Sequence, residues 1–194
     1  MNDIFKTGLI LRSDSTILRP VKLEDYHAFE KITEDQSMWD YFTNDLSNKA
    51  ELKKWIETAV HDLNHGTRLP FTILDKSSYL IIGSTSIGNV SMRDKRAEIG
   101  WTWICKSHQG KGVNDEIKYL MIKHILETAN FSRVEFKTDE LNLPARKALL
   151  RIGATEEGIL RSHTMMTHGR RRDTVYYSIL KSEWDDIKLK NNWL

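Results

Sequence analysis

Residues 101–125 read WTWICKSHQGKGVNDEIKYLMIKHI, and this stretch decides the fold of the chain. A strand pattern runs into the loop QGKGV, residues 109–113, and a long helix is predicted directly after it. Glycines let backbone N–H groups turn inward, and a helix N-terminus adds unpaired donors and about half a positive charge. The stretch therefore predicts an anion site suited to a pyrophosphate, with a plain strand-to-helix turn at the two glycines as the alternative.

Two common phosphate-binding motifs are missing from the sequence. A P-loop needs GxxxxGK followed by Ser or Thr, and no such string occurs. The dinucleotide fingerprint needs GxGxxG, whereas GKG at residues 110–112 continues with VND. NAD and nucleoside triphosphates are therefore disfavoured as ligands.

The segments on either side of this stretch predict a mixed α/β sheet. The predicted helices span residues 22–33, 47–64, 115–129, 145–152 and, as a tail, 184–190. A hairpin or bulged strand is predicted over residues 8–19, and further strands span residues 69–75, 79–92, 96–104, 133–138, 159–166 and 174–180. Asn48 is the expected N-cap of the second helix. Two helices, an antiparallel meander and then alternating strands and helices indicate one α/β domain.

Composition and charge exclude several classes of protein. The 29 Lys and Arg residues against 27 Asp and Glu give a formal net charge of +2, and the basic residues are scattered, which disfavours nucleic-acid binding. A hydrophobic share of 40% with 10 Gly and 3 Pro indicates a folded chain. The single cysteine, Cys105, is expected to be a small buried filler, the seven His are dispersed, and no metal site is predicted. No apolar run approaches the roughly 20 residues of a membrane span, and residues 1–12 show no secretory signal, so a cytoplasmic protein is expected.

The loop and the segments that follow it resemble the GNAT acetyltransferase superfamily, in particular its ribosomal-protein N-acetyltransferase branch. The family's acetyl-CoA loop reads Q/R-x-x-G-x-G/A, and residues 109–114 read QGKGVN. Asn114 departs from the usual Gly or Ala and is a residue type that caps helices. The resemblance continues through RVEFKTDELNLPARKALLRIGATEEGILR, residues 133–161, and GRRRDTVYYSILKSEW, residues 169–184.

This resemblance implies a fold and a domain organisation. The fold is α/β, with a twisted, mostly antiparallel seven-stranded sheet, a splayed central strand pair and about four flanking helices. One acetyltransferase domain would span residues 1–194, with its cofactor-binding core at about residues 97–153. The similarity is strong from about residue 97 to residue 184 and extends earlier only in the layout of elements.

The resemblance also implies how acetyl-CoA would be held. The parted strands would admit the pantetheine arm, pairing it with the backbone of Thr102 and Ile104 as an added strand pairs. A backbone N–H at Trp103 or Ile104 is an expected oxyanion donor. Asn142 matches the family asparagine that contacts the arm, although the residue types alone indicate a turn before Pro144. The pyrophosphate would rest on backbone N–H groups, with Lys111 adding charge, at Gln109, Gly110, Lys111, Gly112, Val113 and Asn114.

Transfer of an acyl group to an amine needs a base, and two residues are candidates. Glu98 is predicted to share a strand face with Gly100, Thr102 and Ile104 by period-two alternation. The alternative is a cross-strand partner for an Arg or Lys on a wet face. His163, which alternates with its neighbours in RSHTMM, has an unperturbed pKa of about 6.5 that suits acid-base work, unless it is structural.

The expected general acid is missing from this chain. Family members often carry a Ser three residues after the asparagine, where this chain has Ala145, or a Tyr in the same helix, where it has Leu149 and Leu150. The branch's second glutamate corresponds to Thr164. A thiolate with a conjugate-acid pKa near that of cysteine, about 8.5, needs less help in leaving than an alkoxide does.

The acceptor pocket is expected from SMWDYFTND, residues 37–45, in which Trp39, Tyr41 and Phe42 are candidate substrate-binding residues. Covering a sheet edge is the alternative role for these aromatics. Three arginines, residues 170–172, are expected at a solvated hairpin tip, with an acidic partner as the alternative.

The sequence thus predicts an acetyl-CoA-dependent N-acetyltransferase that acts on a primary amine in a ternary complex. The acceptor, a protein N-terminus or a small-molecule amine, and the choice between monomer and homodimer stay open. A non-catalytic acyl-CoA sensor, motivated by Ala145 and Thr164, and a ribosome-associated interaction protein, motivated by residues 170–172, are the alternatives.

Overall fold

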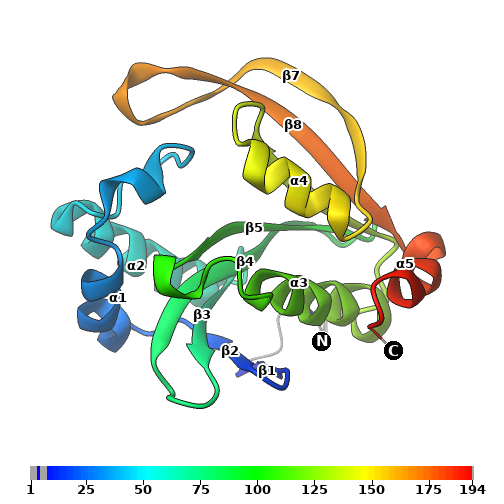
Figure 1. Ribbon diagram of the computed structural model, residues 1–194, viewed down its shortest axis with the longest axis horizontal. Helices are drawn as coiled ribbons and strands as arrows, with labels where there is room; N and C mark the ends of the chain where they lie inside the picture. The colour runs from blue at the N-terminus through cyan, green and yellow to red at the C-terminus, as the bar shows by residue number, and fades with distance from the viewer. Residues whose placement is uncertain (1–3, 5–7, 194) are drawn as a thin grey trace.

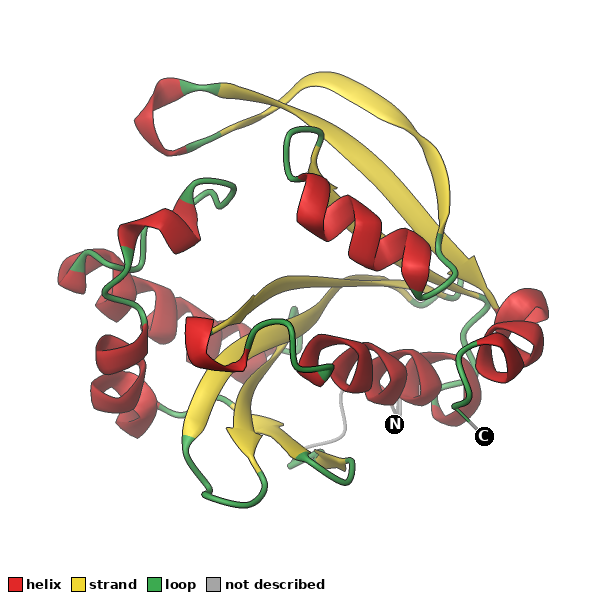
Figure 2. Cartoon of the chain, viewed as in Figure 1, coloured by secondary structure: helices red, strands yellow, loops and turns green. Residues whose placement is uncertain are grey.

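The computed structural model describes residue 4 and residues 8–193, so the prediction about a secretory signal falls partly outside the described residues. One eight-stranded sheet runs through the molecule in the order β1-β2-β3-β4-β5-β6-β8-β7. Neighbouring strands are antiparallel except β5 and β6, which run parallel. Helices lie on both faces of the sheet, and the long β7–β8 hairpin arches over α4 (Figures 1 and 2). No helix in the described part is long and apolar enough to cross a membrane.

The strands fall close to the predicted ranges. They are β1 Leu11–Arg12, β2 Thr16–Pro20, β3 Leu69–Asp75, β4 Ile81–Ser91, β5 Arg96–Ile104, β6 Arg133–Asp139, β7 Thr155–Met165 and β8 Arg171–Leu180. The predicted count of seven strands was short by one, because the first hairpin pairs Leu11 with Leu18 and so adds the two-residue β1 to the sheet edge. β7 begins four residues before the predicted start, since pairing with β8 extends it through exposed, polar residues.

Five α-helices and several short 3-10 turns cover the sheet. The α-helices are α1 Tyr26–Ile32, α2 Lys49–His65, α3 Val113–Lys123, α4 Leu143–Arg151 and α5 Trp184–Lys190. α3 continues as a π-helical turn, His124–Thr128, so the predicted end of the central helix is confirmed within one residue. Apolar side chains of α3, α4 and α5 share one core with the sheet, and those of α1 and α2 form a second core with Trp103.

The helix starts show which capping predictions hold. Asn48 is the N-cap of α2, because its side-chain oxygen accepts hydrogen bonds from the backbone of Ala50 and Glu51 at 2.9 and 3.2 Å. The suggestion that Asn114 caps the central helix is wrong. Gly112 is the N-cap of α3, with a left-handed φ of 83° that glycine adopts without strain, and Asn114 lies inside the first turn.

The two central strands part, and this positions the site. β5 and β6 pair only over three residues, from Arg96 with Arg133 to Glu98 with Glu135. Beyond these pairs β5 continues to Ile104 and β6 to Asp139, with no ladder between them. The splayed strand pair expected from the sequence is therefore confirmed.

Candidate active site

A cleft of about 890 Å³ opens between the parted strands. Its walls come from β5 and β6, the loop before α3, the first turns of α3, one side of α4 along its length, and the β7–β8 hairpin. Phe42 closes one side, and Thr167 near the hairpin tip donates a hydrogen bond to the Phe42 carbonyl at 3.5 Å. The cleft therefore joins segments that lie far apart in the sequence, from Met38 to Arg172.

The loop before α3 presents backbone donors to the cleft. Gly110 and Gly112 both have positive φ, 73° and 83°, and both line the cleft together with Gln109 and Asn114. The Gln109 amide donates to the Ile104 carbonyl at 2.7 Å, which fixes the loop against the end of β5. Within the described residues, the backbone N–H groups of 110–112 donate no recorded hydrogen bond, and the first amides of a helix have no intrahelical acceptor. This arrangement can bind an anion.

Two predicted loop residues, Lys111 and Val113, do not line the cleft. Lys111 is exposed and does not line the cleft. The Val113 side chain is buried in the core beneath α3. Any contribution of Val113 to an anion site is thus through its backbone N–H.

A β-bulge in β5 changes which residues share a face. Ser86 pairs with Gly100, but Ser84 pairs with Trp103, so β5 carries an extra residue between these pairs. Trp101 lies there with a φ of 52°. Its ring covers Gly88, where a Cβ would lie only 2.8 Å from the ring, so the absence of a side chain at Gly88 makes room for it.

The prediction that Glu98 shares a face with Gly100, Thr102 and Ile104 therefore holds for Gly100, which precedes the bulge, and is wrong for the other two. Past the bulge, Thr102 turns toward α3 and contacts Thr85 Oγ1 at 2.7 Å, and Ile104 packs in the core beneath α3. Trp103 packs instead in the second core, beneath α1 and α2. All three still line the cleft, because it opens along the edge of β5.

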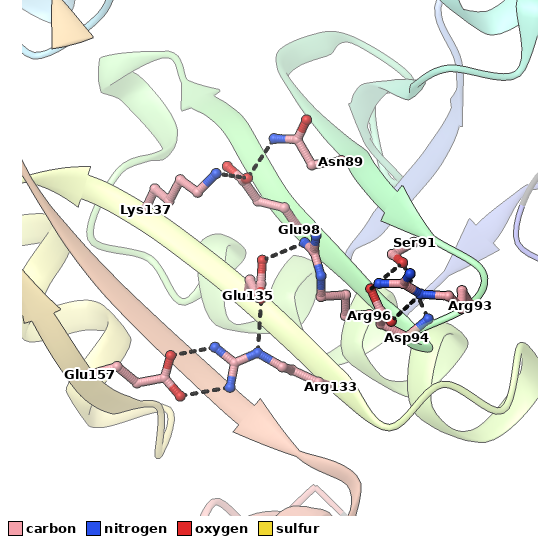
Figure 3. A network of polar contacts seen from close by, with 10 residues as sticks. All are labelled: Asn89, Ser91, Arg93, Asp94, Arg96, Glu98, Arg133, Glu135, Lys137 and Glu157. Carbon is pink, nitrogen blue, oxygen red and sulfur yellow. Dashed lines mark hydrogen bonds and ion pairs between the residues drawn. The ribbon is translucent and has the colours of Figure 1, made fainter. Parts of the chain in front are cut away.

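Glu98 is buried at the point where the strands part, with 5% of its surface exposed. Its Oε2 accepts from Lys137 Nζ at 2.7 Å and from Asn89 Nδ2 at 2.7 Å (Figure 3). Its Oε1 accepts no recorded hydrogen bond from the described residues and faces Gly100, where a Cβ would lie 3.2 Å away. Burial acts to lower the pKa of Lys137, but the hydrogen bond and charge of Glu98 outweigh burial and raise it.

A basic cross-strand partner was the alternative role for Glu98, and Lys137 is such a partner. The pair lies in a buried cleft and not on a wet face. The ion pair therefore orients one carboxylate oxygen and leaves the other facing the cleft.

His163 lies in an irregular part of the β7–β8 ladder. The register passes from Leu160 opposite Thr174 to Thr164 opposite Arg172, so the predicted simple alternation around His163 does not hold. Its Nδ1 lies 3.1 Å from Thr174 Oγ1, and its ring meets Tyr176 edge-on at 5.9 Å. His163 lines the same cleft as Glu98.

The predicted acceptor residues separate into two groups. Phe42 lines the cleft, whereas Trp39 is 2% exposed, donates to the Thr33 carbonyl at 3.0 Å and packs edge-on against Phe42 and Trp103. Tyr41 is exposed at 37% and does not line the cleft. Trp39 thus packs in the core beneath α1 and α2 against Trp103 of the central strand β5, which is neither an acceptor-binding position nor a sheet edge.

Two further predicted residues have mainly structural contacts. Asn142 is the N-cap of α4 and accepts from the Ala145 backbone at 3.1 Å; its side chain does not line the cleft. Cys105 is buried as predicted, with Sγ 3.3 Å from His108 Nδ1. Cys105 itself does not line the cleft, whereas His108 does.

Four cations line the cleft that were not predicted there, and one of them, Arg172, was expected at a solvated hairpin tip instead. Lys118 projects from α3, Lys137 from β6, Arg151 from α4 and Arg172 from β8. Arg151 pairs with Asp115 at 2.8 Å across the mouth of the loop. The sequence offered a signal for one of these residues. Arg151 lies in the last turn of a predicted helix, where a cation is common.

The three arginines at the hairpin are engaged within the chain. Arg170 forms an ion pair with the buried Asp139, and Arg171 donates to the backbone and side chain of Ser162. Arg172 donates to Thr174 at 2.9 Å and lines the cleft. The solvated hairpin tip expected for these residues thus holds for the exposed Arg171, whereas Arg172 faces the cleft.

Comparison with known proteins gives consistent matches. Residues 16–155 match the acetyltransferase (GNAT) domain family. A Bacillus subtilis protein, YdaF, named provisionally as a ribosomal N-acetyltransferase, is 34% identical over 108 residues, which cover 56% of this chain and 58% of YdaF. The structure of a GCN5-related N-acetyltransferase from Brucella melitensis has a TM-score of 0.87 at 22% identity and covers 96% of this chain and 85% of that chain. That of Mycobacterium smegmatis RimJ, in complex with CoA-disulfide, has a TM-score of 0.79 at 22% identity and covers 95% and 94%.

Proposed function

Because the chain belongs to the GNAT acetyltransferase family, as the sequence resemblance predicted, we propose that it moves an acetyl group from acetyl-CoA to a primary amine by direct attack in a ternary complex. One observation carries the proposal: the cleft between β5 and β6 continues to the unpaired amides of the loop before α3. An extended thioester with a diphosphate at one end has the shape and charge that such a cleft accommodates. The CoA-disulfide bound to the similar RimJ fold supports a ligand of this class.

The residues present fit acetyl-CoA. The backbone N–H groups of residues 110–114 would hold the diphosphate, with Arg151 as a nearby cation. The free edge of β5 at Thr102 and Ile104 would pair with the amides of the pantetheine arm, and Trp103 or Ile104 would supply a backbone N–H for the oxyanion. Acetyl-CoA supplies an activated acyl group with a thiol as its leaving group. Asn142 in this proposal acts by holding the first turn of α4 in place.

Glu98 is the proposed base. Its Oε2 is fixed by Lys137 and Asn89, which leaves Oε1 as the oxygen directed into the cleft toward Gly100. A fixed carboxylate with one open oxygen can accept a proton from an ammonium or amine, directly or through water. The ion pair with Lys137 thus holds the carboxylate in place for this role.

The acceptor would enter between Phe42 and the β7–β8 hairpin. His163 is the second candidate for acid-base work from this side, with its ring oriented by Thr174 and Tyr176. The name of YdaF makes N-terminal peptides of ribosomal proteins the first acceptors to test, followed by polyamines, amino acids and aminoglycosides.

A non-catalytic acyl-CoA sensor is the second candidate function. Ala145, Ala148 and Leu149 form the α4 wall of the cleft and offer no side-chain proton donor. Such a sensor would bind acetyl-CoA without releasing CoA thiol in the presence of amines.

Thermal unfolding with and without acetyl-CoA tests the cofactor assignment. A ligand at 100 times its Kd stabilises the folded state by about 2.7 kcal/mol, which for a chain of this size raises Tm by about 5–10 °C. No shift at millimolar acetyl-CoA would reject the assignment. Release of free thiol with a panel of peptides and amines then separates the transferase from the sensor.

Two glycine variants locate the binding site. Gly112→Trp places an indole in the loop and should abolish the shift caused by acetyl-CoA. Gly66→Trp is the matched control, because Gly66 also has a positive φ, 66°, and open space around it but lies at the end of α2. Loss of the shift in both variants, or in neither, would contradict the proposed cradle.

A further inference from the structure

Lys118 is a buried lysine that points into the gap between the parted strands. It lies on α3 and is 6% exposed. Its Nζ donates to Thr102 Oγ1 on β5 at 2.9 Å and lies 5.7 Å from the centroid of the Phe136 ring on β6. The ammonium group is therefore placed between the two strands, beyond the last pair of their ladder.

This lysine is poorly compensated for a buried cation. An ammonium group has three donors, and Thr102 Oγ1 is the single acceptor recorded for it within the described residues. No carboxylate of the described residues lies within 4.0 Å of it. Burial lowers the pKa of Lys118 to about 7, although the charge of Glu98 opposes this.

The two carboxylates that line the cleft already have basic partners other than Lys118. Besides Lys118, the charged or titratable residues that line the cleft are Glu98 on β5, His108 before the loop, Asp115 on α3, Lys137 on β6, Arg151 on α4, His163 on β7 and Arg172 on β8. Glu98 is paired with Lys137, and Asp115 is paired with Arg151. Lys118 is thus not needed to neutralise either carboxylate, and its donors remain available to a ligand in the cleft.

We infer that Lys118 is the missing proton donor of this site and that its Nζ contacts the sulfur of the acyl donor. This inference rests on the proposed function. As the acceptor nitrogen forms its bond to the acyl carbon, the C–S bond breaks and the sulfur takes the electron pair. Lys118 Nζ gives that sulfur a proton, the acceptor nitrogen loses its own proton to Glu98, and solvent restores both residues. The α4 wall, with Ala145 and Leu149, offers no alternative donor.

Free CoA gives a direct measurement that needs no acceptor. A thiol beside an ammonium group has a lowered pKa, because the thiolate and the cation stabilise each other. The two groups then titrate as a coupled pair, and the thiolate forms at a lower pH than in solution. The ultraviolet absorbance of the thiolate, recorded against pH for protein saturated with CoA, reports this directly.

Lys118→Met should remove the effect. In the unchanged protein the thiolate fraction of bound CoA at pH 7 should exceed that of free CoA by at least about tenfold, since cysteines beside cations commonly show pKa values of about 3.5–7.5. In Lys118→Met it should fall back to that of free CoA. Lys123→Met is the matched control, because Lys123 lies on the same helix but is exposed. Cys105 is present in all three proteins, so its own signal cancels in the comparison.

The outcomes are distinct. If CoA binds to the unchanged protein and to Lys118→Met with the same thiolate titration, the inference about Lys118 is wrong while the proposed function stands. If CoA does not bind the unchanged protein, the proposed function is wrong and the inference falls with it. Should Lys118→Met not fold, Lys118→Gln, which keeps a donor for Thr102 without the charge, gives the same comparison.

Discussion

Replacing Lys118 by Met should stabilise the protein, and the gain should depend on pH. Burial lowers the pKa of Lys118 from the ordinary 10.5 to about 7 in the folded chain. At 1.36 kcal/mol for each pH unit of that difference, the charged lysine destabilises the folded state by about 5 kcal/mol. The folded pKa is the lower one, so the unfolded chain binds the proton more tightly. The penalty is therefore complete below pH 7, shrinks as pH rises, and vanishes above pH 10.5.

Chemical denaturation at two pH values measures this. At pH 6 the variant should be more stable than the unchanged protein by about 4–5 kcal/mol, and at pH 9 by about 2 kcal/mol. These values come from the charge alone. The lost hydrogen bond to Thr102 costs about 1 kcal/mol, so the net gains expected are about 3–4 kcal/mol at pH 6 and about 1 kcal/mol at pH 9. The methionine side chain keeps most of the contact with Phe136. The exposed Lys123→Met should change stability by less than about 0.5 kcal/mol at either pH.

A gain that is the same at both pH values would refute the reasoning. It would mean that Lys118 keeps an ordinary pKa in the folded chain, through water or a partner reaching its Nζ. A loss of stability at pH 6 would refute it more strongly, because packing would then outweigh the charge.

Three further predictions concern other parts of the chain. Gly100→Ala puts a methyl group 3.2 Å from Glu98 Oε1, and Glu98→Gln removes the base. Both variants should lower kcat at every pH while the Kd of acetyl-CoA stays near its starting value. Unchanged turnover in both would remove Glu98 from the mechanism. Asp139→Asn removes the charge of a 1% exposed carboxylate that pairs with Arg170. Because the Arg170 side chain itself is 37% exposed, the loss should be about 1.5–3 kcal/mol in denaturation, and a loss below about 0.5 kcal/mol would show that the pair is screened by water. Trp39→Ala empties the core beneath α1 and α2 and should cost about 3–5 kcal/mol, with a neutral result pointing to a surface role instead.

The elements whose signals are local could be predicted from the sequence. The ranges of β3 and β5 agree with the strand patterns because alternation and β-branched residues are contained within each strand. Asn48 was identified as a cap because the motif lies within four residues. β7 was shortened in the prediction because its first residues are exposed and polar, and only its pairing with β8 makes them a strand.

The details of the site depend on contacts that no local pattern contains. The bulge at Trp101 places a tryptophan at positive φ, a conformation that its residue type does not favour, and the room for its ring comes from Gly88 on the neighbouring strand. This one extra residue moved Thr102 to the opposite face from Glu98. Lys118 follows Ile117 at the border of the apolar stripe of α3, where a lysine normally extends to solvent. Its burial follows from Thr102 and Phe136, which belong to other strands.

The cost of Lys118 is itself an argument about its role. A penalty of about 5 kcal/mol is a large fraction of the 5–15 kcal/mol by which a folded domain is stable. Nothing in the packing of α3 requires a charge, since Ile117 and Met121 already hold the helix to the core and a methionine at position 118 would fill similar space. A buried cation that the fold does not need is expected where a ligand brings negative charge, because the ligand then removes the penalty. The same substitution should therefore act in opposite directions on two measurements, raising the free energy of unfolding and lowering the thiolate fraction of bound CoA. A buried lysine with no contact to CoA would give the same rise in the free energy of unfolding but no change in the thiolate fraction.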